Sequence, residues 1–128
     1  MEKHHIFQFG ILELFDSYAV ITCNNDVNID FSEVQEIDIV LGSTYGEATF
    51  GLIANRKNFY SVNPLAINKL FSNENLIAGA IVGYTEAAKG NAVIEKMAIK
   101  NAPIQYFVNI VEAKDWVSCK IREACEGQ

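Results

Sequence analysis

Two runs of apolar residues limit the folds that this 128-residue chain can adopt. Segment 48–54 ends in FGLIA, and segment 76–84 reads LIAGAIVGY, without polar alternation. A strand that faces water on one side usually alternates between apolar and polar residues, whereas a continuous apolar run is typical of an interior strand covered on both faces. The sequence therefore predicts an α/β fold in which helices pack against a sheet whose central strand is 76–84.

The other predicted strands complete one mixed sheet. Alternating residues over 5–14 and branched or aromatic residues over 18–23 indicate two strands, and the short connection between them makes them antiparallel. A last short strand is expected at 104–107. The expected order is β-β-α-β-α-β-α-β-α, with an N-terminal antiparallel hairpin and crossover helices.

Capping signals precede each of the four predicted helices. Asp30 with Glu33, and Asn109 with Glu112, have capping-box spacing, Asn63 stands before Pro64, and Thr85 can cap a helix that runs to about residue 99. The first helix is expected to end near Gly42. Small and apolar residues at helical spacing are expected to pack the third helix against the sheet, and they are Ala87, Gly90, Ile94, Met97 and Ala98.

Length and composition favour one domain over residues 1–128. We expect this domain to be located in the cytoplasm, from its lack of a visible signal and its cysteine pattern. Half of the residues are hydrophobic, which excludes disorder. No secretory signal is visible, and segment 76–84 is far shorter than the roughly 20 residues of a membrane-spanning helix. Cys23, Cys119 and Cys125 lack C-x-x-C spacing, so we expect reduced thiols and no bound metal.

The charge is distributed unevenly along the chain. Residues 1–47 carry a net charge of −8, with Lys3 as the one basic residue, and residues 48–128 carry +2. The overall charge of −6 argues against a nucleic-acid partner, which would require many phosphate-neutralising side chains. Self-association or a partner with a basic surface fits this distribution, although an acidic helix face over 33–38 explains most of it.

The loop 55–63 is the most informative candidate site. It joins the end of an interior strand to a helix, the edge where open α/β sheets tend to place ligands. Two cations lie beside aromatic residues in this loop, so an anionic group would meet positive charge, a hydroxyl and helix N–H groups. The predicted ligand-binding or partner-binding residues are Asn55, Arg56, Lys57, Asn58, Tyr60 and Ser61. An exposed Arg-Lys pair on solvated surface remains the alternative.

Three further polar positions have structural as well as functional interpretations. Asn91 is near-helically spaced from Ala87 and Ile94, so it is either a polar support on the buried side or a residue at the rim of the packing face. His4 and His5 are the only histidines and lie at the N-terminus. There, the interpretation that they have no function is favoured over metal binding. Histidine-based catalysis and most zinc sites are therefore disfavoured.

The order of elements resembles the STAS domain, and more closely the short stand-alone bacterial proteins grouped as SpoIIAA-like or STAS/SEC14 proteins. The resemblance covers the whole chain as an architecture, and at residue level it rests on segments 50–64 (FGLIANRKNFYSVNP), 80–82 (AIV) and 91–96 (NAVIEK). It implies a single STAS-like domain that acts as a non-enzymatic regulatory module. Such a module would bind a protein partner or a small anionic ligand at the loop 55–63. A homodimer formed through an exposed strand or helix face is also expected.

In the antagonist branch of this family, the resemblance implies a phosphorylatable serine in an Asp-Ser-x-Gly motif at the start of the helix after the third strand. This chain departs from that pattern, which argues against classical sigma-factor regulation. Ser61 is the hydroxyl of this class nearest the expected place, two residues before Asn63. Ser61 is therefore the candidate phosphorylation site.

Two other functions stay open. The SEC14 label implies a carrier of lipids or hydrophobic small molecules, which a deep apolar cavity under the final helices would support. An enzyme ranks third, because the sequence contains neither Gly-x-Gly-x-x-Gly after a strand nor a phosphate-binding loop, and no histidine lies near a candidate nucleophile. No cofactor is expected.

Overall fold

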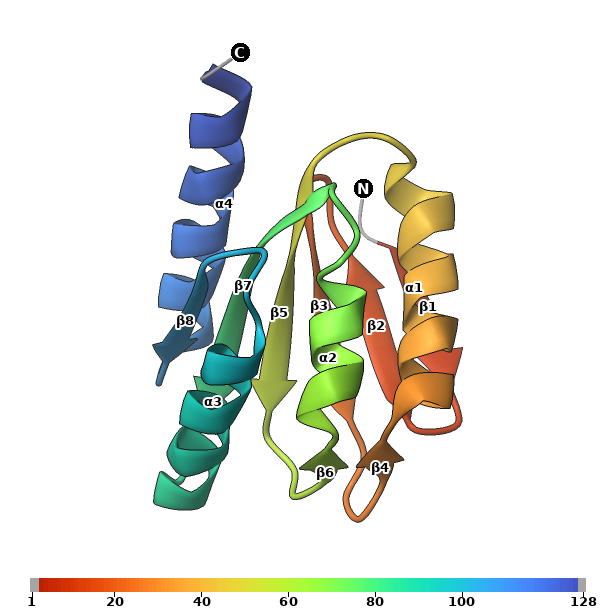
Figure 1. The fold of residues 1–128 in the computed structure, drawn as a ribbon, viewed down its shortest axis with the longest axis vertical. Helices are drawn as coiled ribbons and strands as arrows, with labels where there is room; N and C mark the ends of the chain where they lie inside the picture. Colours follow the sequence, from red (N-terminus) through yellow and green to blue (C-terminus); the bar gives the residue numbers. More distant parts are fainter. Residues whose placement is uncertain (1–2, 127–128) are drawn as a thin grey trace.

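The computed structural model, which describes residues 3–126, contains a six-stranded mixed sheet, a two-stranded sheet and four helices (Figure 1). In chain order the elements are β1 Lys3–Phe7, β2 Gly10–Leu14, β3 Tyr18–Cys23, β4 Asn28–Ile29, α1 Phe31–Tyr45, β5 Phe50–Arg56, β6 Ser61–Val62, α2 Pro64–Leu70, β7 Leu76–Gly83, α3 Glu86–Ala98, β8 Ile104–Phe107 and α4 Ile110–Glu126.

The strand order β1-β2-β3-β5-β7-β8 confirms the predicted mixed sheet. The pairs β1–β2 and β2–β3 are antiparallel, and the pairs β3–β5, β5–β7 and β7–β8 are parallel. The prediction that segment 76–84 is the central strand is wrong. β7 is buried, but it lies next to the edge strand β8, while β3 and β5 occupy the middle. Its continuous apolar sequence reflects helices on both faces and not the distance from an edge.

The single strand predicted over 5–14 is in fact a hairpin. β1 and β2 pair with Phe7 opposite Gly10, and Gln8 and Phe9 form the turn. Alternation continues through this turn, and the turn has no Asn-Gly or Asp-Gly pair, so the sequence carries no obvious break. Gly10 is required by packing, because a Cβ there would lie 2.4 Å from the carbonyl oxygen of Thr22.

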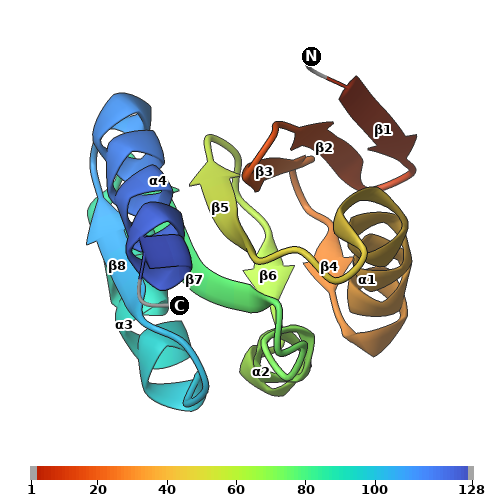
Figure 2. The same ribbon diagram turned by 90° about the horizontal axis from the view of Figure 1, so that it is seen from above.

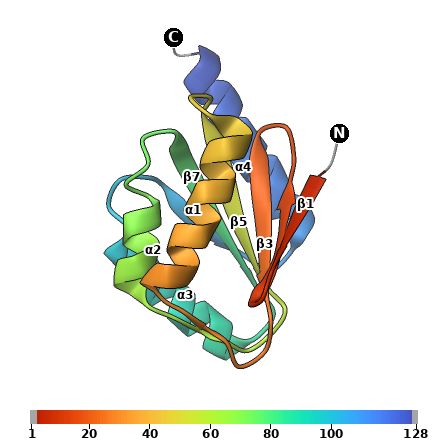
Figure 3. The same cartoon turned by 90° about the vertical axis from the view of Figure 1, so that its right-hand side faces the viewer.

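The helices form two unequal layers. α1, α2 and α3 cover one face of the sheet, and α4 packs on the other (Figure 2). Seen from the side, α4 also extends beyond the end of the strands (Figure 3). Ala113, Val117 and Ile121, at helical spacing on α4, are buried against the sheet. None of the helices within residues 3–126 combines the length and apolar character needed to span a bilayer.

The capping signals predicted the helix starts well. Asp30 and Glu33 form both arms of a capping box, and the side chains of Asn63, Thr85 and Asn109 accept hydrogen bonds from backbone N–H groups at the starts of α2, α3 and α4. The predicted end of the first helix near Gly42 is wrong. α1 continues to Tyr45, whose hydroxyl donates to the carbonyl oxygens of Phe15 and Tyr18.

The predicted packing face of the third helix is also wrong. Met97 is 72% exposed, Ile94 is largely exposed, and no atom lies within 4 Å of a Cβ built on Gly90. The buried residues of α3 are Ala92 and Glu95. Small side chains let this helix approach the sheet, and its larger apolar residues face outward.

Two glycines test this packing in opposite directions. A Cβ at Gly51 in β5 would lie 2.3 Å from Cγ1 of Val117, a fully buried side chain of α4. We expect Gly51→Ala to lower the free energy of unfolding by about 1–3 kcal/mol through overpacking. Gly90→Ala should raise it by about 0.5–1 kcal/mol, because alanine favours an exposed helix position. Urea denaturation of both variants measures this, and equal effects would contradict the packing.

Candidate functional site

The parallel strands bring the candidate residues to one edge of the sheet. β5 and β7 are in register with Asn55 opposite Val82 and Arg56 opposite Gly83, so their carboxyl ends lie together. The loop after β5 therefore lies beside Tyr84 and Thr85, which lead into α3. The strands β3, β5, β7 and β8 follow one another without a reversal of order, and their crossover helices share one face. The connections after β5 and β7 thus lead to helices on the same face, so the loop after β5 does not lie at the switch point at which α/β folds open a deep crevice.

Arg56 points into the molecule and not toward solvent, which corrects the expectation of an exposed Arg-Lys pair. Its side chain is 9% exposed and forms a two-pronged ion pair with the carboxylate of Glu95 on α3. Burial alone would lower the pKa of the guanidinium, but the hydrogen bonds and charge of Glu95 raise it above its ordinary value. Arg56 therefore stays charged, and its charge is already balanced.

Tyr60 and Cys23 extend this buried polar cluster. The guanidinium carbon of Arg56 lies 5.7 Å from the centre of the Tyr60 ring, within the range of a cation–π contact. Burial raises the pKa of the Cys23 thiol to about 11, and a hydrogen bond from Tyr60 and the charge of Arg56 oppose that rise only in part. Burial likewise raises the pKa of the Tyr60 hydroxyl, although the positive charge of Arg56 acts to lower it. Both side chains are therefore neutral near pH 7.

One polar atom of the cluster has no partner. The Nε of Arg56 is buried without a hydrogen-bond acceptor, as is Oδ1 of Asn68 in α2 among the described residues. Arg56 also borders an apolar cavity of about 50 Å³. That space exceeds the roughly 10–15 Å³ that one water requires.

The cavity lies between the sheet and the layer of α1, α2 and α3. Within the described part of the chain, its charged lining side chains are Arg56 and Glu95. The remaining lining residues are Ile21, Cys23, Ile29, Ile37, Leu52, Ala54, Tyr60, Val62, Ile67, Leu70, Phe71, Gly79, Ala80, Ile81, Ile99 and Ile104. It is a different space from the one expected under the final helices, because α4 covers the opposite face.

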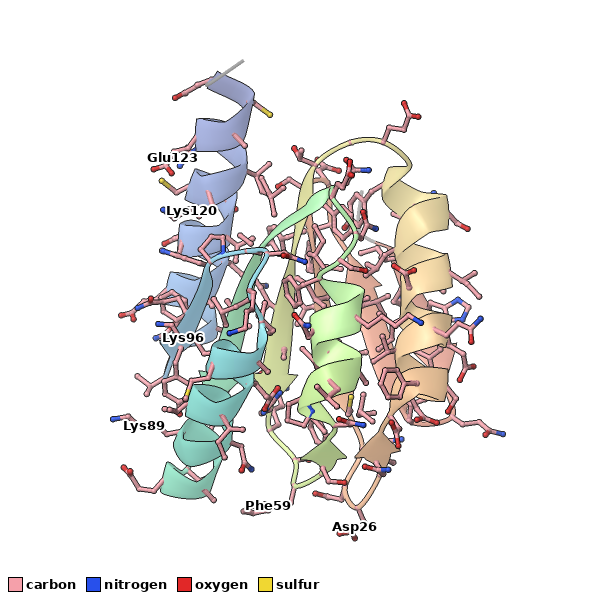
Figure 4. The ribbon with its side chains drawn as sticks, in the orientation of Figure 1. Asp26, Phe59, Lys89, Lys96, Lys120 and Glu123 are labelled. Carbon is pink, nitrogen blue, oxygen red and sulfur yellow. The ribbon has the colours of Figure 1, made fainter. Side chains whose placement is uncertain are left out.

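A shallow groove of about 50 Å³ opens on the solvent side of Arg56 and Tyr60. Lys57 is exposed at this groove, and Phe59 and Tyr84 supply exposed aromatic rings. Figure 4 shows Phe59 projecting from the end of the loop after β5. Among residues 3–126 the lining consists of Arg56, Lys57, Asn58, Phe59, Tyr60, Tyr84, Thr85, Ala88 and Asn91, none of which is acidic.

Two predicted site residues hold the loop in place. Asn55 is buried and accepts a hydrogen bond of 2.8 Å from the hydroxyl of Tyr84. The amide of Asn58 donates to the carbonyl oxygen of Cys23 at 2.8 Å, which fixes the loop to the end of β3. Asn58 also reaches the groove, whereas Asn55 supports it from below.

Ser61 lies apart from the groove in the short strand β6. β6 pairs in parallel with β4, and the Ser61 hydroxyl donates to Oδ1 of Asn28 at 2.8 Å. The side chain is exposed, so a kinase would reach it. A phosphate there would replace the contact with Asn28. Phosphorylation of Ser61 stays a prediction.

Asn91 is exposed and lines the rim of the groove, so the interpretation as a polar support on the buried side is wrong. The buried polar residue of α3 is Glu95, which the sequence analysis did not single out. Its signal was present: Ala88, Ala92, Glu95 and Ile99 share one helical face, and Glu95 is the one ionisable residue among them. Within residues 3–126, no cluster of three His, Cys, Asp or Glu side chains is arranged to hold a metal.

Comparison with solved structures identifies the architecture. The chain is similar to an uncharacterised protein of the DUF3478 family from Shewanella loihica PV-4, which is described as having a SpoIIAA-like fold. The match has a TM-score of 0.55 and 12% sequence identity, and it covers 91% of this chain and 92% of that one. The fold is SpoIIAA-like. This SpoIIAA-like chain matches no family model and no curated protein.

The ion pair gives a test of burial at the site. Glu95→Met and Arg56→Met each leave one partner buried without its counter-charge, and we expect each to lower the free energy of unfolding by about 3–5 kcal/mol. The double variant Arg56→Met/Glu95→Met should recover most of that loss, because neither charge is then buried alone. Urea denaturation measures all three, and additive losses in the double variant would contradict a coupled pair.

The thiols give a second test. Because its raised pKa leaves little thiolate at neutral pH, we expect buried Cys23 to resist iodoacetamide at pH 7.5 in the native protein. Exposed Cys125 should react under the same conditions and serves as the internal control. Peptide mass spectrometry locates the label, and both residues should react in urea. Equal native labelling of both would show that the cluster is open to solvent.

Proposed function

We propose that this SpoIIAA-like chain is a non-enzymatic binding module whose groove takes an anionic group. The observation that carries the proposal is the charge of the groove. Lys57 is its exposed cation, Arg56 is neutralised by Glu95, and none of the described residues that line it is acidic. An anion placed there would meet one uncompensated positive charge.

The neighbouring groups suit a ligand with a flat apolar body. Phe59 and Tyr84 are exposed on the groove, and rings of this kind stack on planar molecules. The amides of Asn58 and Asn91 offer hydrogen bonds at its edge. A small aromatic or amphipathic carboxylate combines these features, and an acidic side chain of a protein partner offers the same carboxylate chemistry.

The groove lacks the parts of a catalytic site. Among the described residues its lining holds neither a carboxylate nor a histidine, so the exposed Thr85 and Tyr84 have no general base in the groove. Thr85 also accepts the backbone N–H of Ala88 as the cap of α3. We therefore place binding ahead of catalysis.

A carrier of small hydrophobic molecules is the second candidate, and the apolar cavity favours it. Its volume of about 50 Å³ accommodates a few heavy atoms, whereas sites for drug-sized ligands occupy roughly 300–1,000 Å³. A long acyl chain would require α2 to move. Native mass spectrometry of protein purified from its own cells separates the candidates, since a carrier would retain an apolar molecule and an anion-binding module would not.

Benzoate and inorganic phosphate are suitable probes of the groove. We expect benzoate to shift the backbone amide signals of the loop 55–63 in NMR titrations, and Lys57→Ala to raise its dissociation constant about tenfold. Lys100→Ala, an equal charge change at the far end of α3, should leave the constant unchanged.

If benzoate shifts the amide signals and inorganic phosphate does not, the aromatic body of the ligand is required for binding. Binding that is equal in wild type and Lys57→Ala would overturn the assignment of the groove. If neither probe binds but a protein partner is retained and Lys57→Ala releases it, the anionic group belongs to that partner.

A further inference from the structure

The third helix turns its larger apolar side chains outward. Its buried face carries Ala92 and the ion-paired Glu95, whereas Val93, Ile94 and Met97 are 55%, 58% and 72% exposed. These three residues lie three or four positions from Met97 or from one another's neighbours, so their side chains adjoin on the outer surface of α3. A surface helix ordinarily directs such residues toward the core, so this exposed group indicates a contact surface.

Two lysines border this apolar face. Lys89 and Lys96 are exposed and line a groove of about 120 Å³ between α3 and β8. Val93 follows Lys89 by four residues and precedes Lys96 by three, so it adjoins both. Figure 4 shows both lysines projecting outward from α3. Neither forms an ion pair with another residue in the range 3–126, so their charges are available to a partner.

The two carboxylates of α3 leave a positive balance on this face. Glu95 is buried and neutralised by Arg56. Glu86 is exposed in the first turn, where it also meets the positive end of the helix dipole. Because Lys100 follows the end of the helix, the exposed residues of segment 86–100 carry three positive charges and one negative charge.

The negative charge of the chain is concentrated on the far side of the helical layer. Residues 1–47 carry a net charge of −8. α1, which belongs to this acidic part, is separated from α3 by α2 (Figure 1). Two interhelical spacings of roughly 8–10 Å each exceed the screening length of about 8 Å at physiological salt. The overall charge of −6 therefore does not prevent α3 from approaching an anionic surface.

From these observations we propose that the outer face of α3 docks on an anionic lipid surface. Lys89 and Lys96 would meet the phosphate groups, and the three exposed apolar side chains would enter the acyl region beneath them. A lipid surface fits because it offers negative charge and apolar chains within one helix diameter. A nucleic acid would leave the apolar side chains without a partner, and a second copy docked α3 against α3 would bring like charges together. The contact is independent of the function proposed above.

Vesicle cosedimentation tests the role of charge. The probes are phosphatidylcholine vesicles with and without about one-third phosphatidylserine, at near-physiological salt. We expect wild type to bind the anionic vesicles more tightly than the neutral ones. Lys89→Gln/Lys96→Gln should raise the dissociation constant about thirtyfold, or roughly fivefold for each lysine. The control Lys114→Gln/Arg122→Gln makes the same change of charge on α4, over the opposite face of the sheet, and should alter the constant less than about twofold.

A second pair of variants tests the role of the apolar side chains. Ile94→Ser/Met97→Ser should raise the dissociation constant at least about tenfold, because serine gains little on entering an acyl layer. The control Ile39→Ser/Val111→Ser removes two exposed apolar side chains from α1 and α4 and should leave the constant unchanged. Circular dichroism verifies that every variant folds.

Three results would overturn the proposal: no binding of wild type to anionic vesicles, equal binding to both kinds of vesicle, or binding that neither α3 variant weakens more than its control. Retention of an acidic partner protein without vesicle binding would also overturn it and would assign the face to that protein. Benzoate binding should persist in both α3 variants, so failure of this proposal is distinguishable from failure of the proposed function.

Discussion

The buried ion pair between Arg56 and Glu95 determines how the candidate site is arranged. It joins the carboxyl end of β5 to the middle of α3, two elements 39 residues apart in sequence. By drawing Arg56 inward, it leaves Lys57 as the exposed cation of the groove and makes one wall shared by the groove and the internal cavity. Apolar residues of similar volume would often serve stability as well as such a pair. We therefore infer that the ion pair acts mainly by fixing the position of α3, and less by adding to the stability of the fold.

The topology explains why the site is a shallow groove. Because β3, β5, β7 and β8 follow one another in order, all three crossover helices lie on one face and pack side by side. α3 follows β7 onto this face and α4 follows β8 onto the other, so helices diverge to opposite faces at the edge strand β8 and not beside the groove at β5 and β7. The same topology produces a continuous helical layer with an acidic end at α1 and a basic side at α3. Crossover helices that all lie on one face therefore give the molecule a broad helical surface instead of a deep crevice.

Much of the fold could be predicted because its signals are local. The apolar sequences of β5 and β7 indicate burial on two faces, and Asp30, Asn63 and Thr85 mark helix starts by hydrogen bonds to their own neighbours. The misplaced face of α3 has a different cause. A search for helical periodicity is dominated by large apolar residues, so the predicted packing face was drawn through Ile94 and Met97 and not through Ala88 and Ala92. Small residues, however, are the ones that allow a helix to approach a sheet closely. Whether such residues face inward depends on partners that are distant in sequence.

The site shows the same division between local and distant causes. Composition and loop position pointed to segment 55–63, and the structure places Lys57, Asn58 and Tyr60 of that segment at one groove. The orientation of Arg56 depends on Glu95, and no spacing rule links a residue after a strand to one in a later helix. A buried carboxylate on a helix whose neighbours at i−3, i+4 and i−7 are small or apolar is nevertheless a usable signal. Such a residue must find a cation or a polar ligand, because an isolated buried charge costs too much free energy to persist. In this chain the cation is Arg56, and it is therefore the charge that the site cannot offer to a ligand.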